Sequence, residues 1–100
     1  MKHDQIVADL ESRLQDSSIP WETHTYIEHT TPDGRLGEID LYAIYDGTVL
    51  LFEVKSTDRI KNEEKAFYQL TRAQENFPGM RCILFYAAGI GPRAYRIHKV

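Results

Sequence analysis

The stretch GEIDLYAIYDGTVLLFEVKST (residues 37–57) decides the fold of this chain. It contains two runs rich in β-branched and aromatic residues, LGEIDLYAIY and TVLLFEVKS, which are separated by Asp46-Gly47. Asp-Gly between two such runs is the strongest short-range signal for a β-hairpin. The same stretch places acidic residues and a lysine in the part of the sheet that should be most buried, where charged side chains need a compensating partner.

A two-residue turn at Asp46-Gly47 sets Asp40 opposite Glu53 and Glu38 opposite Lys55. Directly opposed side chains project from the same face of a sheet, with β-carbons about 4.5–5.5 Å apart, so these four polar side chains should form one cluster. The apolar residues expected on the other face are Ile39, Leu41, Leu50, Phe52 and Val54.

Opposed carboxylates destabilise a sheet, especially where water is partly excluded. Three kinds of compensation are open: one carboxylate is protonated, Lys55 and another base neutralise the pair, or a divalent cation binds. We favour the cation, because two convergent carboxylates with water suit Mg²⁺ or Mn²⁺. Lys55 then lies where an amine orients or deprotonates an attacking water. A simpler interpretation is a Glu38–Lys55 ion pair, with Asp40 and Glu53 at a solvated strand end.

The residues before the hairpin predict a helix and a strand. Apolar residues recur at helical spacing from about Asp4 to Gln15, which indicates an amphipathic helix. ETHTYIEHT (22–30) is typical of a strand. TPDGR (31–35) predicts a turn, with Pro32, Asp33 and Gly34 at positions that suit turn geometry.

The residues after the hairpin predict a second helix and two more strands. The helix is expected between Asn62, as its cap, and Pro78-Gly79, which ends it. Its expected inward residues are Phe67, Leu70, Ala73 or Gln74, and Phe77. MRCILFYAA (80–88) reads as a buried strand in parallel pairing, and AYRIHKV (94–100) as an edge strand. The predicted class is α/β (α+β): an αβββαβ core plus a last strand, with a mixed central sheet flanked by helices, in one domain over residues 1–100.

Composition limits the kind of protein. Hydrophobic residues make up 42% and charged residues 27% of the 100 residues, as in ordinary globular domains. No apolar run approaches the ~18–20 residues of a membrane span, and the N-terminus lacks the apolar segment of a signal peptide, so we expect a cytoplasmic protein. Cys82 is the only cysteine, which excludes an intrachain disulfide and a cysteine-based zinc site.

The charge is unevenly distributed along the chain. The net charge is −3, which argues against a general nucleic-acid binder. However, residues 1–54 carry 3 basic and 11 acidic side chains, whereas residues 76–100 carry 4 basic and no acidic ones. This asymmetry permits a positive surface on an acidic protein.

The segments GEID (37–40) and FEVKS (52–56), joined by a hairpin, resemble the D…ExK signature of the PD-(D/E)XK nuclease superfamily, with Ile39-Asp40 in place of the nominal Pro-Asp. The chain looks most like archaeal-type Holliday junction resolvases and related small phage or homing endonucleases. The order of elements agrees with the restriction-endonuclease-like core over most of the chain. The resemblance implies that Asp40 and Glu53 bind Mg²⁺ or Mn²⁺ with help from the Val54 carbonyl, while Lys55 positions the attacking water.

Two further residues match positions used in this superfamily. Glu11, on the first helix, matches an occasional acidic residue that completes the metal site, or it is a solvated helical glutamate. Gln69, in AFYQL, matches a glutamine that many relatives point toward the site, or it is a polar residue flanking the helix. The histidines His3, His24, His29 and His98 show no ligand spacing and are expected to be ordinary surface or strand residues.

The implied reaction is hydrolysis of DNA phosphodiester bonds to 5′-phosphate and 3′-hydroxyl ends, in DNA recombination or repair, by a homodimer that is cellular or phage-encoded. Residues expected to contact phosphates are Arg59, Lys61, Lys65, Arg72, Arg93, Arg96 and Lys99. Each of them taken singly is equally typical of a solvated surface. The alternatives are a site-specific endonuclease of homing or restriction type, a non-catalytic DNA-binding or assembly module on the same scaffold, and a small domain whose acidic pair is structural.

Overall fold

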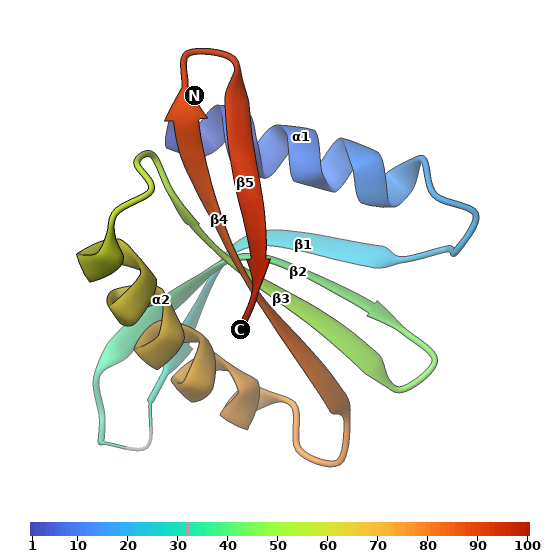
Figure 1. Ribbon diagram of the computed structural model, residues 1–100. Helices are drawn as coiled ribbons and strands as arrows, with labels where there is room; N and C mark the ends of the chain where they lie inside the picture. Colours follow the sequence, from blue (N-terminus) through green and yellow to red (C-terminus); the bar gives the residue numbers. More distant parts are fainter. Residues whose placement is uncertain (32) are drawn as a thin grey trace.

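The computed structural model describes residues 1–31 and 33–100, and Pro32 of the predicted turn lies outside them. In this part of the chain a five-stranded sheet carries two α-helices (Figure 1). The elements are α1 (His3–Gln15), β1 (Glu22–Thr30), β2 (Leu36–Tyr45), β3 (Thr48–Lys55), α2 (Ile60–Ala73), the short 3-10 helix η1 (Gln74–Asn76), β4 (Arg81–Gly91) and β5 (Ala94–Lys99). None of the helices in the described residues is long and apolar enough to cross a membrane.

The sheet has the strand order β1-β2-β3-β4-β5. Neighbouring strands are antiparallel except β3 and β4, which are parallel and are connected through α2. A parallel pair needs such a crossover, because a tight turn can join only antiparallel strands. The predicted class is therefore confirmed, as are the parallel pairing of β4 and the edge position of β5.

The hairpin turn has the geometry that its sequence predicts. Asp46 and Gly47 both have positive φ, at 48° and 76°. Two successive positive φ angles match the right-handed twist of the flanking strands, which is why Asp-Gly is favoured there. The pairing that follows, from Tyr45 with Thr48 to Leu41 with Phe52, has the predicted register.

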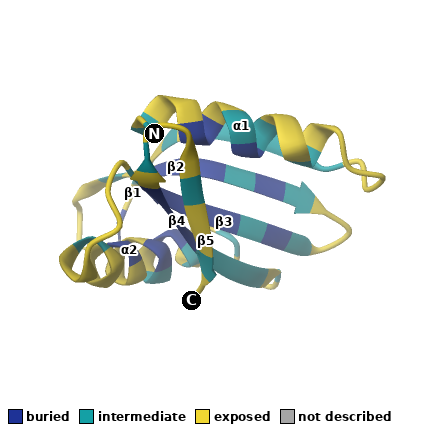
Figure 2. Ribbon diagram, turned by 45° about the horizontal axis from the view of Figure 1, so that its top comes forward, coloured by how far each residue is buried: buried dark blue, intermediate teal, exposed yellow. Residues whose placement is uncertain are grey.

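The two helices cover opposite faces of the sheet (Figure 2). On one face α1 packs against buried residues of β2, β3 and β4, in the cluster Ile6, Val7, Leu10, Leu41, Phe52, Val54 and Ala87. On the other face α2 contributes to the cluster Ile39, Val49, Leu51, Leu70 and Ala73. Burial of each large aliphatic side chain stabilises the fold by about 1.5–3 kcal/mol.

Two predictions about α2 were wrong. The helix begins at Ile60 with Arg59 as its N-cap, whereas Asn62 lies inside the first turn and donates a hydrogen bond to the Thr57 carbonyl at 2.8 Å. Phe67 is 49% exposed, and the inward position belongs to Ala66, which packs with Tyr86 and Ala88. The small alanine lets the helix approach the sheet closely, and Phe67, one residue further round the helix, points outward.

Candidate active site

Strands β2 and β3 separate where the acidic residues begin. In the described residues their ladder ends at Leu41–Phe52, one position before Asp40 and Glu53. Beyond that point the backbone N–H of Val54 donates to Oδ2 of Asp40 at 2.8 Å. The Asp40 carboxylate thus accepts a hydrogen bond that a strand carbonyl would take in a continued ladder, so the carboxylate lies in the fork between the strands. The predicted ladder pairs Asp40–Glu53 and Glu38–Lys55 are not formed there.

The backbone of β2 is distorted at Asp40. Ile39 packs in the cluster on the α2 face, whereas Leu41 packs in the cluster on the α1 face. Residues two apart in a regular strand share a face, so the expected alternation is broken, and the prediction that Ile39 and Leu41 lie on the same face was wrong. On the neighbouring strand Tyr26, between the paired positions Thr25 and Ile27, has φ 54°. The irregularity of both strands turns the Asp40 side chain toward the fork.

Asp40 and Glu53 form a buried acidic pair. Asp40 is 4% exposed and Glu53 is 6% exposed. Burial, the negative charge of Asp40 and a side-chain hydrogen bond with Asp40 together raise the pKa of Glu53 to about 8, while Lys55 acts in the opposite direction. Two buried carboxyl groups that influence each other in this way favour either a proton or a cation between them.

Lys55 belongs to the same cluster. Its Nζ lies 3.4 Å from Oε1 of Glu53, and its side chain is 22% exposed. The alternation of β3 puts both residues on one face, as the sequence predicted. The partner of Lys55 is therefore Glu53 and not Glu38. When both carboxyl groups are ionised, the single half-buried ammonium leaves an excess of negative charge at the fork, which a proton on Glu53 or a bound cation offsets.

The first turn of α1 completes the surroundings of Asp40. Nε2 of His3 lies 3.2 Å from Oδ2 of Asp40, and Nδ1 of His3 lies 3.1 Å from Oδ1 of Asp4. The Tyr26 hydroxyl donates to the same Asp4 oxygen at 2.7 Å. Burial and the hydrogen bond to Asp4 raise the pKa of Tyr26 to about 12, so the hydroxyl keeps its proton. A chain of polar contacts thus runs from Tyr26 through Asp4 and His3 to Asp40.

Sequence reasoning missed this chain of contacts. His3 was expected to be an ordinary surface histidine, but it contacts a buried carboxylate because α1 begins beside the fork. The signal that the sequence offered was a histidine and an aspartate at the predicted start of the first helix. Glu11 was considered instead, yet it lies eight residues further along α1, which is about 12 Å along the helix axis. Its carboxylate accepts a hydrogen bond from Thr23 at 3.3 Å.

Gln69 and Glu38 lie together, but away from the buried pair. Glu38 is exposed and is paired with Glu28 on β1, and Gln69 is exposed on α2. Both line a small pocket of about 130 Å³ that Arg72 also lines. Neither has a described contact with Asp40 or Glu53. The structure therefore unites Asp40, Glu53, Lys55 and Val54 of the predicted site, and places Glu11, Glu38 and Gln69 outside it.

The predicted phosphate-binding residues of α2 are all exposed: Arg59, Lys61, Lys65 and Arg72. Lys61, Lys65 and Arg72 recur at intervals of four and seven residues, so they form one stripe along the helix. The stripe lies on the side of α2 that faces away from the buried Ala66 and Leu70. Its position leaves it accessible to a polyanion.

The donor set fits a hard divalent ion. In residues 1–31 and 33–100 no group of three or more His, Cys, Asp and Glu side chains is arranged to hold a metal ion. Mg²⁺ does not require such a group, because it is commonly held by one or two carboxylates and keeps several waters. The buried pair Asp40 and Glu53 supplies those carboxylates, and a cation that binds there would replace the proton that Glu53 otherwise holds.

Comparison with known proteins adds information about the fold. No family model and no curated protein matches the chain. Among solved structures, two chains match. One is the crystal structure of a protein of unknown function, AF1548, which is 16% identical, with a TM-score of 0.55, over 88% of this chain and 46% of that chain. The chain spans about half the length of that protein, and similarity at this level of identity shows a shared fold alone.

Proposed function

We propose that this protein is a metal-dependent DNA endonuclease of the PD-(D/E)XK type that hydrolyses phosphodiester bonds to 5′-phosphate and 3′-hydroxyl ends. The observation that carries the proposal is the buried pair of Asp40 and Glu53 at the fork of β2 and β3, with the Lys55 ammonium 3.4 Å from Glu53. A purely structural role gives no reason to bury two carboxylates together, because each ion costs several kcal/mol to desolvate.

Asp40 and Glu53 are the residues that would hold Mg²⁺ or Mn²⁺, with the Val54 carbonyl as the third protein ligand that the superfamily resemblance implies. The bound ion would polarise the scissile phosphate and stabilise the charge that develops on the leaving oxygen. The protein holds Asp40 ready for this role, since the Val54 N–H and His3 both contact Oδ2 and leave Oδ1 for another partner.

Lys55 acts on the attacking water and on the negative charge of the phosphate. Its amine is the basic group beside the acidic pair, and it reaches Glu53 from one side of the fork. In this position it can orient a water molecule for in-line attack, and its positive charge offsets the charge that accumulates during the reaction. His3 is a positioning residue, because it acts through Asp40.

The DNA contacts proposed for α2 follow from its basic stripe. Lys61, Lys65 and Arg72 point outward along one line, and Arg59 precedes them at the N-cap. Lys and Arg at such positions bind phosphates without reading the base sequence, which suits an enzyme that recognises DNA structure. A site-specific endonuclease would need side chains that reach base edges in a groove.

We propose further that the protein acts as a homodimer, which places two active sites on two strands. The supporting feature is an apolar patch on α2, separate from the basic stripe, where Ile60 is 78% and Phe67 is 49% exposed. Glu63 and Glu64 border the patch, and Lys61 and Lys65 flank them on the same helix. Two copies of α2 that pack through Ile60 and Phe67 across a two-fold axis would bury this apolar surface and leave the basic stripe free to contact DNA.

Cleavage assays test the proposal. The purified protein is incubated with Mg²⁺ or Mn²⁺ and labelled four-way, forked, nicked, single-stranded and duplex DNA. We expect cutting by the wild type and a loss of at least about 100-fold in Asp40→Asn and Glu53→Gln, as is typical when a group that stabilises the transition state is removed. Glu75→Gln, at an exposed glutamate of η1 outside the acidic pair and the α2 patch, is the matched control and should cut normally.

The same variants separate the alternatives. Activity that survives in Asp40→Asn and Glu53→Gln belongs to a contaminant or another site. DNA binding without metal-dependent cutting of any substrate would favour the non-catalytic module. Calorimetry with Mn²⁺ provides a measurement that is independent of activity, and a wild type that binds no divalent ion would contradict the metal site directly.

A further inference from the structure

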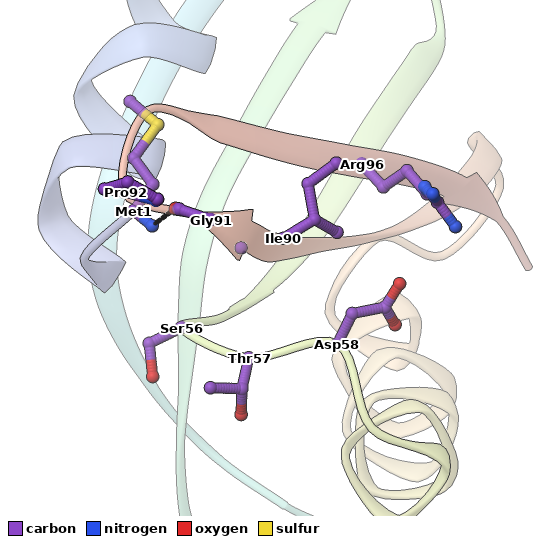
Figure 3. A pocket seen from close by; sticks show the side chains of 9 residues that line it. Met1, Ser56, Thr57, Asp58, Ile90, Gly91, Pro92 and Arg96 are labelled. Atoms are coloured by element: carbon purple, nitrogen blue, oxygen red, sulfur yellow. Dashed lines mark hydrogen bonds between the residues drawn. The ribbon is translucent and has the colours of Figure 1, made fainter.

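A hollow of about 610 Å³ lies beside Ser56, the residue that follows Lys55 in the chain (Figure 3). One wall is the segment Ser56–Asp58, which follows β3, and the other is the end of the β4–β5 hairpin with Ile90, Pro92 and Arg96. We call it the hairpin hollow. Because Lys55 pairs with Ala88 and Glu53 with Tyr86, the hairpin continues outward from the rungs that carry the acidic site.

The frame of the hairpin hollow is held by backbone contacts. The Asp58 N–H donates to the Gly89 carbonyl at 3.1 Å, and the Met1 ammonium donates to the Gly91 carbonyl. A β-carbon on Gly89 would lie 2.4 Å from the Ser56 carbonyl oxygen and 2.8 Å from that of Met1, so only glycine permits this approach. The hairpin is thus fixed to both the end of β3 and the start of the chain.

The hairpin presents an apolar edge to solvent. The ladder between β4 and β5 pairs Gly89 with Tyr95 and Gly91 with Ala94, so Ile90 is the extra residue of a β-bulge. Bulges redirect side chains, and Ile90 is 47% exposed here. Pro92, two residues further, is also exposed. Two exposed apolar side chains of the hairpin, on either side of Gly91, therefore line the hollow.

The charge around these side chains is positive. Arg96 lines the hollow and is exposed, the exposed Arg93 follows Pro92 in the chain, and the sequence has no acidic residue after Glu75. The carboxylate that faces the hollow is Asp58, and it already has partners: His98 at 3.4 Å and the Tyr86 hydroxyl at 3.4 Å. Arginine next to exposed isoleucine and proline is the combination with which proteins unstack bases while they hold the phosphate backbone.

We propose that the hairpin hollow binds an unpaired nucleotide next to the cleaved phosphate, with Ile90 and Pro92 against its base and Arg96 near its phosphate. This inference rests on the proposed nuclease function and specifies its substrate, which is DNA with an unpaired or branched strand. Gly91 lies three residues beyond the rung of Lys55, or about 10 Å along the strand. At about 3.4 Å per stacked nucleotide, the cut falls within about three nucleotides of the branch point.

Binding of a forked DNA tests the inference without cleavage. The fork carries the fluorescent base 2-aminopurine at its first unpaired position, and binding is measured in Ca²⁺ against a continuous duplex of the same length. We expect the wild type to bind the fork about tenfold more tightly and to change the fluorescence of the probe. Ile90→Ser should reduce the preference to less than about threefold and leave duplex affinity unchanged. Pro92→Ser is a second, independent variant with the same expected direction.

Ile19→Ser is the matched control, because Ile19 is 41% exposed and follows the opposite end of α1. It should behave as the wild type. A fork preference that persists in both Ile90→Ser and Pro92→Ser overturns the inference, as does a wild type without any preference. A wild type that cuts plain duplex in an Asp40-dependent reaction but shows no fork preference would refute the inference and keep the nuclease. A wild type that prefers forked DNA but does not cut it in Mg²⁺ or Mn²⁺ would refute the nuclease and keep the binding of an unpaired nucleotide.

Discussion

Replacing Glu53 by glutamine tests the acidic fork through protein stability. Folding raises the pKa of Glu53 from 4.5 to about 8, so the folded protein holds a proton that the unfolded chain has already released. The free energy of unfolding must then fall as the pH rises from about 4.5 to about 8, because the folded state binds more protons over that range. Glu53→Gln removes the titrating group and keeps its size and its ability to donate a hydrogen bond to Asp40.

The size of the effect follows from the change in pKa. With 1.36 kcal/mol per pKa unit, the contribution of Glu53 to the free energy of unfolding falls by about 3 kcal/mol between pH 5 and pH 8. Other groups titrate in the same range, but they are common to both proteins and cancel in the difference. Glu53→Gln should therefore be more stable than the wild type at pH 8 in metal-free buffer, and the gain should be much smaller at pH 5.

Urea denaturation at pH 5, 6, 7 and 8 in the presence of a chelator measures this difference. Glu75→Gln, at an exposed glutamate of η1, is the control, because it keeps Glu53 and should therefore follow the pH dependence of the wild type. Addition of Mg²⁺ should stabilise the wild type at pH 8 by about 2.7 kcal/mol at a concentration 100 times the dissociation constant, and should leave Glu53→Gln unchanged. A difference between wild type and Glu53→Gln that is flat from pH 5 to pH 8 would refute the buried, proton-binding fork.

Three further predictions concern other parts of the molecule. His3→Ala should weaken Mn²⁺ binding about tenfold in calorimetry, because residues that orient a metal-binding carboxylate change metal affinity by about this factor. Unchanged Mn²⁺ affinity would show that His3 does not position Asp40. Gly89→Ala should lower the free energy of unfolding by about 1–3 kcal/mol through overpacking. Gly91→Ala, with open space around its β-carbon, should differ from the wild type by less than about 1 kcal/mol. Equal effects of the two variants in denaturation experiments would contradict the close approach of Gly89 to the Ser56 and Met1 carbonyl groups. Phe67→Glu should convert the proposed dimer into a monomer in sedimentation experiments, and a dimer that survives the change would exclude the α2 patch as its interface.

The hairpin was predictable from the sequence because its signals are local. Asp46-Gly47 specifies a turn with two positive φ angles, and the turn fixes the register of the strands that follow it. The alternation of β3 then puts Glu53 and Lys55 on one face. The parallel partner of β3 was also predictable, because a strand, a helix and an apolar run imply a crossover.

The fork itself was not predictable by the same reasoning. Period-two alternation assumes a regular strand, but the alternation of β2 is interrupted at Asp40, so that Ile39 and Leu41 lie on opposite faces. At this point the Asp40 carboxylate, in place of a backbone carbonyl, accepts the hydrogen bond from the Val54 N–H. The role of His3 was hidden for another reason. It depends on where the start of α1 docks on the sheet, which is a long-range relation that helical periodicity does not contain. Phe67 was wrongly predicted to point toward the sheet, because hydrophobicity alone favours phenylalanine over alanine. The closest contact between α2 and the sheet requires a small residue, and Ala66 occupies that position.

The tight turn at Asp46-Gly47 has a consequence for the order of folding. It joins the two acidic strands locally, so the carboxylates become neighbours when the hairpin closes, an event of about 1–10 μs. We expect the parallel contact of β3 with β4 to form later, because segments that are further apart in the chain pay a larger entropic penalty to meet. The two negative charges therefore first approach each other in water, where repulsion is weak, and lose their hydration only in the later step. We expect divalent ions to leave the earliest phase of refolding unchanged and to accelerate the step in which the sheet closes over the acidic pair.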